Sequence, residues 1–110
     1  MAVQDKDLIF EAEAIRDTAN HNSALSVSGE FMAKTITVEN GLDQQVNCQL
    51  QGSHDGTKWF DVGSSWSVAA TTDGYQTVDT FFPLYRVQAI CGTAPTTGVL
   101  DVCIIKARGI

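Results

Sequence analysis

The sequence predicts an all-β fold, an antiparallel β-sandwich of jelly-roll-like form with about seven or eight short strands. Apolar and polar residues alternate with a period of two from end to end, and few windows show the 3.6-residue period of a helix. Turn residues recur about every ten positions, as in sandwiches and small barrels. The chain has 110 residues, which suits one core, so residues 1–110 are expected to form a single domain.

The N-terminal third holds two predicted strands and a loop. We expect the first strand over Asp7–Arg16, although residues 11–14 (Glu-Ala-Glu-Ala) favour a helix as the alternative. The small polar residues 18–29 are typical of a loop with a short extended piece at 24–27. The alternation in Phe31–Glu39 predicts a strand, and Asn40-Gly41 closes it with a tight turn.

The central third is predicted to form hairpins. Gln45–Gln51 has the cleanest alternation in the chain, with Val46, Cys48 and Leu50 on the buried face. The turn residues 52–57 join it to a short aromatic strand at 58–62, which predicts a hairpin. Segments 66–70 and 75–82 flank Thr71-Thr72-Asp73-Gly74 and predict a further hairpin.

Two strands are expected to complete the domain. Leu84–Cys91 places Tyr85, Val87, Ala89 and Cys91 on one face. A loop over 92–98 leads to a last strand at 99–106, whose Leu100, Val102 and Ile104 are predicted to face the core. Residues 1–16 are a candidate N-terminal arm, and residues 107–110 a candidate C-terminal tail.

Charge and hydropathy exclude several partners. Seven Lys and Arg residues against 13 Asp and Glu residues give a net charge of -6, which repels nucleic-acid phosphate, so no nucleic-acid partner is expected. No apolar run approaches the roughly 20 residues of a membrane span, so no membrane partner is expected. The N-terminus lacks the basic and apolar regions of a secretory signal, which predicts synthesis in the cytoplasm without export.

No motif indicates catalysis or a cofactor, so we predict a non-enzyme with no catalytic, cofactor-binding or metal-binding residues. There is no Gly-x-Ser-x-Gly elbow and no phosphate-binding loop. Cys48, Cys91 and Cys103 are interpreted as buried small hydrophobes in a reducing compartment, with one disulfide as the alternative. His21 and His54 have no second zinc ligand at a useful spacing.

Two binding sites remain as weaker alternatives. Turn carboxylates could converge into a calcium site at one edge of the sandwich; they are Asp55, Asp61 and Asp73. Aromatic side chains gather in the second half of the chain, where they form either the core or a sugar-stacking face. These aromatic residues are Trp59, Phe60, Trp66, Tyr75, Phe81, Phe82 and Tyr85.

Three motifs carry a resemblance to a known class of proteins. They are Gln51-Gly52-Ser53-His54-Asp55-Gly56-Thr57-Lys58-Trp59-Phe60-Asp61-Val62-Gly63, then Pro83-Leu84-Tyr85-Arg86-Val87, and Leu100-Asp101-Val102-Cys103-Ile104-Ile105. Over residues 34–106 the chain resembles small β-sandwich structural proteins of tailed bacteriophages. It also resembles discoidin-type modules, which bind glycans or lipid. Those modules are typically longer, exported and disulfide-linked, so the phage class is favoured.

The phage resemblance implies a non-enzymatic virion protein. It would be a capsid decoration (cement) protein or a head or tail accessory protein, made in the host cytoplasm and incorporated into the virion. Its partner would be the major capsid protein or another virion protein, and it would be a homo-oligomer such as a trimer. Residues 1–16, 18–29 and 106–110 are the expected contact elements. Independently of the resemblance, the residues themselves predict that Arg86 pairs with a carboxylate such as Asp101 and that Trp59 folds back over its hairpin.

Overall fold

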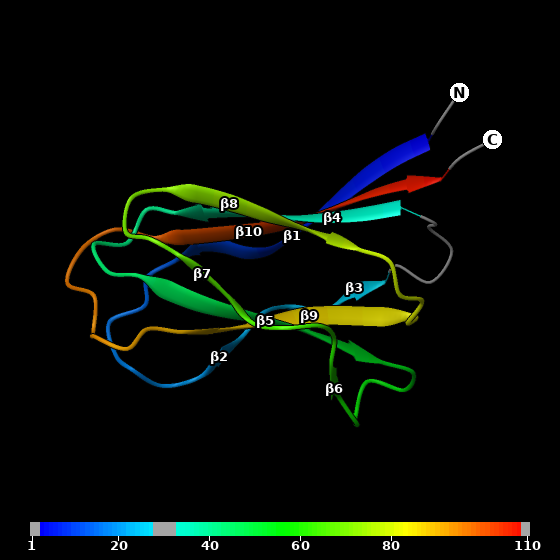
Figure 1. Cartoon of the computed structure of the whole chain (residues 1–110), viewed down its shortest axis with the longest axis horizontal. Coiled ribbons are helices and arrows are strands. Elements are labelled where there is room, and N and C mark those ends of the chain that lie inside the picture. The colour runs from blue at the N-terminus through cyan, green and yellow to red at the C-terminus, as the bar shows by residue number, and fades with distance from the viewer. Residues whose placement is uncertain (1–2, 28–32, 109–110) are drawn as a thin grey trace.

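The computed structural model describes residues 3–27 and 33–108, and the side chains of residues 6–27 and 33–106. Over these residues the chain forms ten antiparallel strands in two facing sheets (Figure 1). The predicted all-β sandwich is therefore confirmed. The strands outnumber the seven or eight expected because three of them are two residues long: β2 (His21–Asn22), β3 (Ser26–Val27) and β6 (Phe60–Asp61).

The first sheet has the strand order β1-β10-β4-β8. It comprises β1 (Val3–Glu13), β10 (Leu100–Arg108), β4 (Ala33–Asn40) and β8 (Asp73–Val78). The second sheet has the order β2-β9-β5-β6, with β3 paired to β9 and β7 paired to β5. Its longer strands are β5 (Val46–Ser53), β7 (Trp66–Val68) and β9 (Leu84–Ile90).

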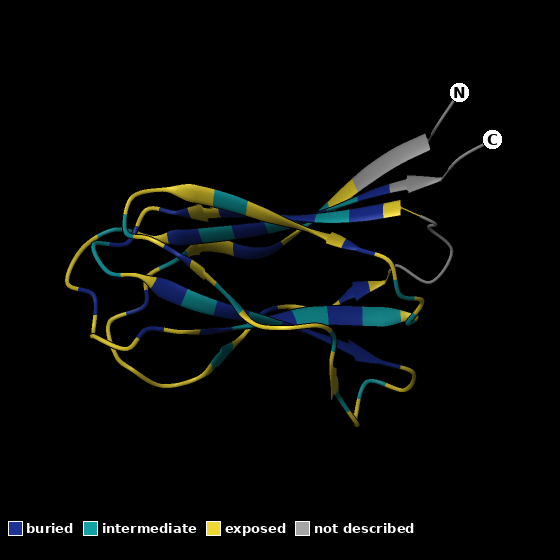
Figure 2. Cartoon of the chain, viewed as in Figure 1, coloured by how far each residue is buried: buried dark blue, intermediate teal, exposed yellow. Residues whose placement is uncertain are grey.

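Alternation along the long strands builds the core between the two sheets (Figure 2). The apolar residues of β5, β9 and β10 that were predicted to point inward are buried, which confirms those predictions. From β5 they are Val46, Cys48 and Leu50; from β9 and the residue after it, Tyr85, Val87, Ala89 and Cys91; from β10, Leu100, Val102 and Ile104.

The N-terminal segment is a strand of the first sheet. β1 pairs with β10 from Val3 opposite Arg108 to Glu13 opposite Leu100. The pairing shifts register on either side of Phe10, which lets the neighbours Ile9 and Phe10 both reach the core. The helix alternative is therefore wrong, and residues 3–13 are part of the sheet instead of an arm. Residues 1–2 of the candidate arm lie outside the described residues.

Two predicted turns do not join hairpins. β4 pairs with β10 and β8, so Asn40-Gly41 carries the chain from one sheet to the other. β7 belongs to the second sheet and β8 to the first, and Asp73-Gly74 forms the start of β8. Both corrections have one cause: a turn dipeptide is a local signal, whereas the partner of each strand depends on burial of distant residues. The hairpin of β5 and β6 is confirmed.

Asn40 fixes the crossing from β4 to β5. Its side chain is 2% exposed, and its Nδ2 donates to the carbonyl oxygens of Gln44, Val68 and Ala69, each at 3.1 Å. Its Oδ1 accepts from the amide of Leu42 at 3.1 Å. The asparagine thus satisfies backbone groups that the crossing removes from the ladders.

The crossing that follows β4 and the crossing that precedes β10 touch each other. The amide of Gly41 donates to the carbonyl of Val99 at 2.9 Å. Gly98 lies opposite with φ 87°, and a Cβ at Gly98 would stand 1.9 Å from the carbonyl oxygen of Gly41. A glycine is therefore required here by both backbone angle and space.

No helix in the described parts of the chain is long and apolar enough to cross a membrane.

Candidate functional site

The outer face of the first sheet is the candidate site. Residues that alternate with the core positions point to solvent there, and the strand register arranges them in rows across the sheet. One row contains Asp101, Glu39 and Asp73, and the next contains Leu8, Cys103, Thr37 and Tyr75. A third row contains Lys6, Ile105, Thr35 and Thr77.

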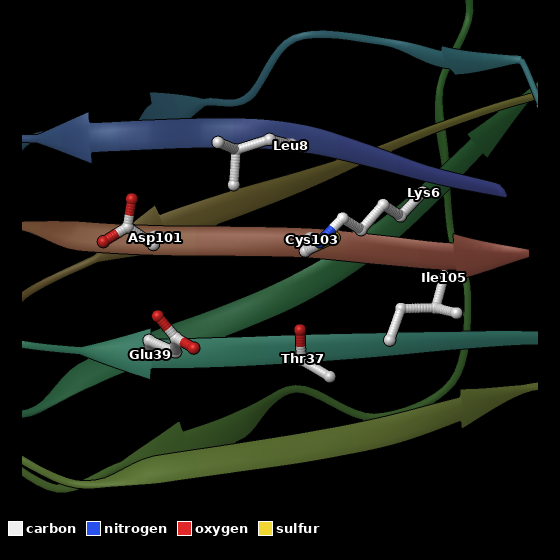
Figure 3. Close-up of a pocket in the computed structure, with 7 residues that line it drawn as sticks. All are labelled: Lys6, Leu8, Thr37, Glu39, Asp101, Cys103 and Ile105. Carbon is white, nitrogen blue, oxygen red and sulfur yellow. The ribbon is translucent and has the colours of Figure 1, made fainter.

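A groove of about 540 Å³ runs over β1, β10 and β4 of this face. Figure 3 shows Leu8, Cys103 and Thr37 in its middle, with Asp101 and Glu39 at one end and Lys6 and Ile105 at the other. The groove therefore has a largely apolar floor between an acidic end and an end that carries Lys6. Leu8 is 48% exposed, which leaves apolar surface open to a partner.

A second hollow of about 350 Å³ continues the groove over β4 and β8. It shares Thr37 and Glu39 with the first, and its far wall is Tyr75, a side chain that is 69% exposed. The two hollows therefore form one concave surface across all four strands, which we call the sheet groove.

Three carboxylates line up at one end of the sheet groove. Asp101 stands opposite Glu39, and Glu39 stands opposite Asp73. The Oδ1 of Asp101 accepts from the amide of Ala12 at 2.8 Å, whereas the carboxylates of Glu39 and Asp73 have no partner among the described residues. Like charges directly opposite each other destabilise a sheet, so folding alone does not account for this row.

The outer face of the second sheet differs because its polar groups bind each other. The Nε of Arg86 donates to Oε1 of Gln51 at 2.9 Å, and the Nε2 of Gln51 donates to Oδ1 of Asp61 at 2.9 Å. The guanidinium of Arg86 lies 4.3 Å from the ring centre of Trp59. The expected pair of Arg86 with Asp101 is wrong, because the two residues belong to different sheets.

The calcium candidates are not brought together. Asp55 lies in the β5–β6 turn, where its Oδ1 accepts from the amides of Lys58 at 3.1 Å and Thr57 at 2.9 Å. Those backbone hydrogen bonds hold the pKa of Asp55 well below its usual range. Asp61 binds Gln51, and Asp73 lies in the other sheet. Within residues 3–27 and 33–108, no three acidic, cysteine or histidine side chains form a metal site.

The cysteines split into two environments. All three are free thiols, which rules out the disulfide alternative in this structure. Cys48 and Cys91 are buried as predicted, and burial raises the pKa of Cys48 to about 12. Cys103 is partly exposed on the sheet groove, so its expected full burial is wrong. Cys103 alternates with the core residues Val102 and Ile104 along β10, so its side chain lies on the outer face of the sheet.

The histidines serve local contacts. The Nε2 of His21 lies 2.7 Å from Oδ1 of Asp17, and the ring of His54 stacks on Phe60 with centroids 6.4 Å apart.

The aromatic residues divide between core and surface. The hydroxyl of buried Tyr85 donates to the carbonyl of Thr80 at 2.7 Å and accepts from the amide of Phe82 at 3.0 Å. Trp66 packs partly buried against the core, so it offers no exposed platform for a sugar. Tyr75 and Phe81 are each 69% exposed, and they lie at separate places: Tyr75 on β8 and Phe81 in the loop before β9.

Sequence reasoning missed the sheet groove. Alternation in β4 and β10 already assigns Glu39 and Asp101 to the solvent side of each strand. The missing information was the register, because only the pairing of β10 with β4 and of β4 with β8 aligns the three carboxylates.

The contact elements expected from the sequence lie partly within the sandwich and partly on its surface, where Leu25 is 51% exposed and Val27 67% exposed. Residues 3–13 lie in β1, and the side chain of Lys106 is buried, with its Nζ 2.8 Å from Oδ2 of Asp7. Residues 28–29 and 109–110 lie outside the described residues.

Comparisons with known proteins identify solved structures that share the fold of this chain, but they show no family for it. The sequence matches no protein-family model and no curated protein. The structure is similar to that of PBSX exported protein XepA, with a TM-score of 0.70 and 13% identity over 96% of this chain and 37% of XepA. The chain thus spans little more than a third of XepA's length.

Two further solved structures match over nearly their whole length. SPBc2 prophage-derived protein YomS gives a TM-score of 0.62 with 14% identity over 97% of this chain and 95% of YomS. PirA gives a TM-score of 0.52 with 15% identity over 97% of this chain and 93% of PirA. At these identities the likeness establishes a common fold.

Proposed function

We propose that this chain is a structural protein of a tailed bacteriophage, a capsid decoration (cement) protein that binds the assembled head. Its partner is the major capsid protein, and it acts as a homo-oligomer such as a trimer, made in the host cytoplasm and carried in the virion. The observation that supports this best is the fold shared along nearly its whole length with the SPBc2 prophage-derived protein YomS. The motifs in residues 34–106 point the same way.

The mechanism is association without chemistry. A protein that binds only the assembled shell stabilises that shell by mass action. Many copies on a repeating lattice make a modest contact strong in total. Burial raises the pKa of all three thiols and so disfavours a cysteine nucleophile.

The test is whether the chain is a stoichiometric part of particles. An epitope tag on the gene, growth of the phage that encodes it and gradient purification of particles would locate the protein. We expect it to sediment with intact heads in a fixed ratio to the major capsid protein. Its presence only in the soluble fraction would contradict the proposal, and its recovery on isolated tails would assign it to the tail instead.

A glycan-binding module is the second candidate, because the 69% exposed ring of Tyr75 borders a hollow of about 350 Å³. Sugar binding at this place predicts that a glycan array gives hits that Tyr75→Ala removes. An array without hits for the wild-type chain would eliminate this candidate.

A further inference from the structure

We propose that the sheet groove is the docking surface of this protein, and that its occupant is a convex apolar segment of another protein with basic side chains at one end. This inference rests on the proposed function and specifies the contact through which the chain would bind the particle. Two features define the occupant: the carboxylate row, which is Asp101, Glu39 and Asp73, and the apolar floor, which is Leu8, Cys103 and Ile105.

The apolar part of the occupant follows from the groove's shape and lining. Leu8, Cys103 and Ile105 supply the floor of a concavity of about 540 Å³, and Leu8 remains 48% exposed. A protruding aliphatic or aromatic side chain that entered this space would remove that surface from water.

The basic part follows from the carboxylate row. Glu39 and Asp73 stand opposite each other with no partner among the described residues. A lysine or arginine at the edge of the occupant would relieve the repulsion and form charge-assisted hydrogen bonds. The whole chain, with a net charge of -6, would steer such a basic surface toward itself.

A second copy of the chain fits the groove poorly. Two copies could pack with the outer faces of their first sheets together and their strands aligned. If the two-fold axis runs parallel to the strands, the carboxylate row of one copy meets the carboxylate row of the other. If the axis runs across the strands, the concave groove of one copy faces the concave groove of the other and leaves a void. Each arrangement lacks either charge complementarity or shape complementarity, so the occupant is a different protein.

The outer face of the second sheet is less suited to be the docking surface. Its Arg86, Gln51 and Asp61 already bind one another, and Trp59 covers Arg86. Fewer unsatisfied groups remain there for a partner.

The size of the groove face predicts a weak single contact. Four strands about 4.8 Å apart, each contributing about six residues, give a footprint on the order of 400 Å². The two partners together would bury about 800 Å², which is below a standard specific interface. Many copies on one particle would therefore be needed for tight binding.

The experiment measures binding of the purified full-length chain to particles of its phage that lack it, by co-sedimentation over a range of chain concentrations. Glu39→Gln removes one carboxylate from the row, and Asp79→Asn removes one exposed carboxylate from the loop before β9 as the matched control. Thr37→Trp fills the middle of the groove, and Gln88→Trp places the same bulk on the opposite face, on β9. Thermal unfolding of each variant checks that it is folded.

We expect Glu39→Gln to weaken binding about tenfold and to flatten its dependence on salt. We expect Thr37→Trp to weaken it about a hundredfold, while both controls bind as the wild type does. Glu39→Gln relieves like-charge repulsion, so its loss of binding should come without loss of thermal stability.

Three results would overturn the inference. Wild-type binding by all four variants would exclude the groove while leaving the proposed function in place. No binding by the wild-type chain would remove both the proposed function and the groove. Dissociation of an oligomer of the free chain by Thr37→Trp, seen by light scattering, would make the occupant a second copy.

Discussion

At the scale of single residues, a buried lysine ties the first and last strands to a short strand of the other sheet. The Nζ of Lys106 lies 2.8 Å from Oδ2 of Asp7 and donates to the carbonyl of Val27 at 3.0 Å. The hydroxyl of Ser26 donates to the same Asp7 oxygen at 2.6 Å. The side chain of Lys106 is 4% exposed and that of Asp7 is 32% exposed, so the pair is only partly screened by water.

This arrangement makes part of the stability depend on pH. Burial disfavours the Asp7 carboxylate, but hydrogen bonds from Lys106 and Ser26 outweigh burial and hold its pKa below the usual 3.8. A lowered folded-state pKa adds stability above the unfolded-state pKa, and that stability is lost as the pH falls through the folded-state value.

We therefore expect Asp7→Asn to lower the free energy of unfolding by about 2 kcal/mol at pH 7. The gap between wild type and variant should shrink as the pH falls below about 4, and urea titrations at pH 7 and at low pH measure it. Asp73→Asn, at a carboxylate without a described partner, is the control and should cost nothing. An equal gap for Asp7→Asn at both pH values would contradict this account.

Sequence patterns predict apolar burial at this scale better than polar burial. Alternation correctly assigned Val87 and Ile104 to the core, because each lies in a long amphipathic strand. It gave no sign that Asn40 and Lys106 are buried, since their burial depends on partners distant in the sequence. Buried polar residues are recognised only when those partners are known.

At the scale of elements, strands were predictable and their partners were not. Each long strand carries its own alternation, so Phe31–Glu39 and Gln45–Gln51 were located to within two residues of β4 and β5 over the described residues. Asn40-Gly41 and Asp73-Gly74 resemble hairpin turns, yet the strands that flank them lie in different sheets. The carboxylate row was missed for the same reason, because it exists only through pairing.

A prediction follows from the contact between Gly41, in the crossing after β4, and Gly98, in the crossing before β10. Gly98→Ala should lower the free energy of unfolding by at least about 3 kcal/mol, since it combines a positive φ with a clash against the Gly41 carbonyl. Gly92→Ala is the matched control in the same loop, because a Cβ there meets nothing within 4 Å. Chemical denaturation of both variants measures the difference, and equal stabilities would show that the junction rearranges freely.

At the scale of the whole molecule, β1 is an edge strand that the sandwich needs to cover its core. It supplies Ile9 and Phe10 to the core, and Ile15 follows just after it with 0% exposure. Its loss would leave β10 unpaired along one edge and open the core to water.

Removal of residues 1–16 should therefore prevent folding instead of merely weakening binding to a particle. Circular dichroism and light scattering of the truncated chain should show loss of the cooperative thermal transition and aggregation. A truncated chain that melts cooperatively near the wild-type temperature would show that β1 is dispensable. A chain truncated in this segment would therefore lose particle binding through loss of folding.

The pairing of β1 with β10 also brings the start of β1 beside the end of β10, with Val3 opposite Arg108 (Figure 1). Polypeptide that continues from the start of β1 or from the end of β10 would leave the domain on the same side. The fold can therefore be inserted as a unit into a surface loop of a host protein, which needs adjacent ends. The same geometry suits it to multicopy display, since cargo fused on this side would project from one fixed point on each copy.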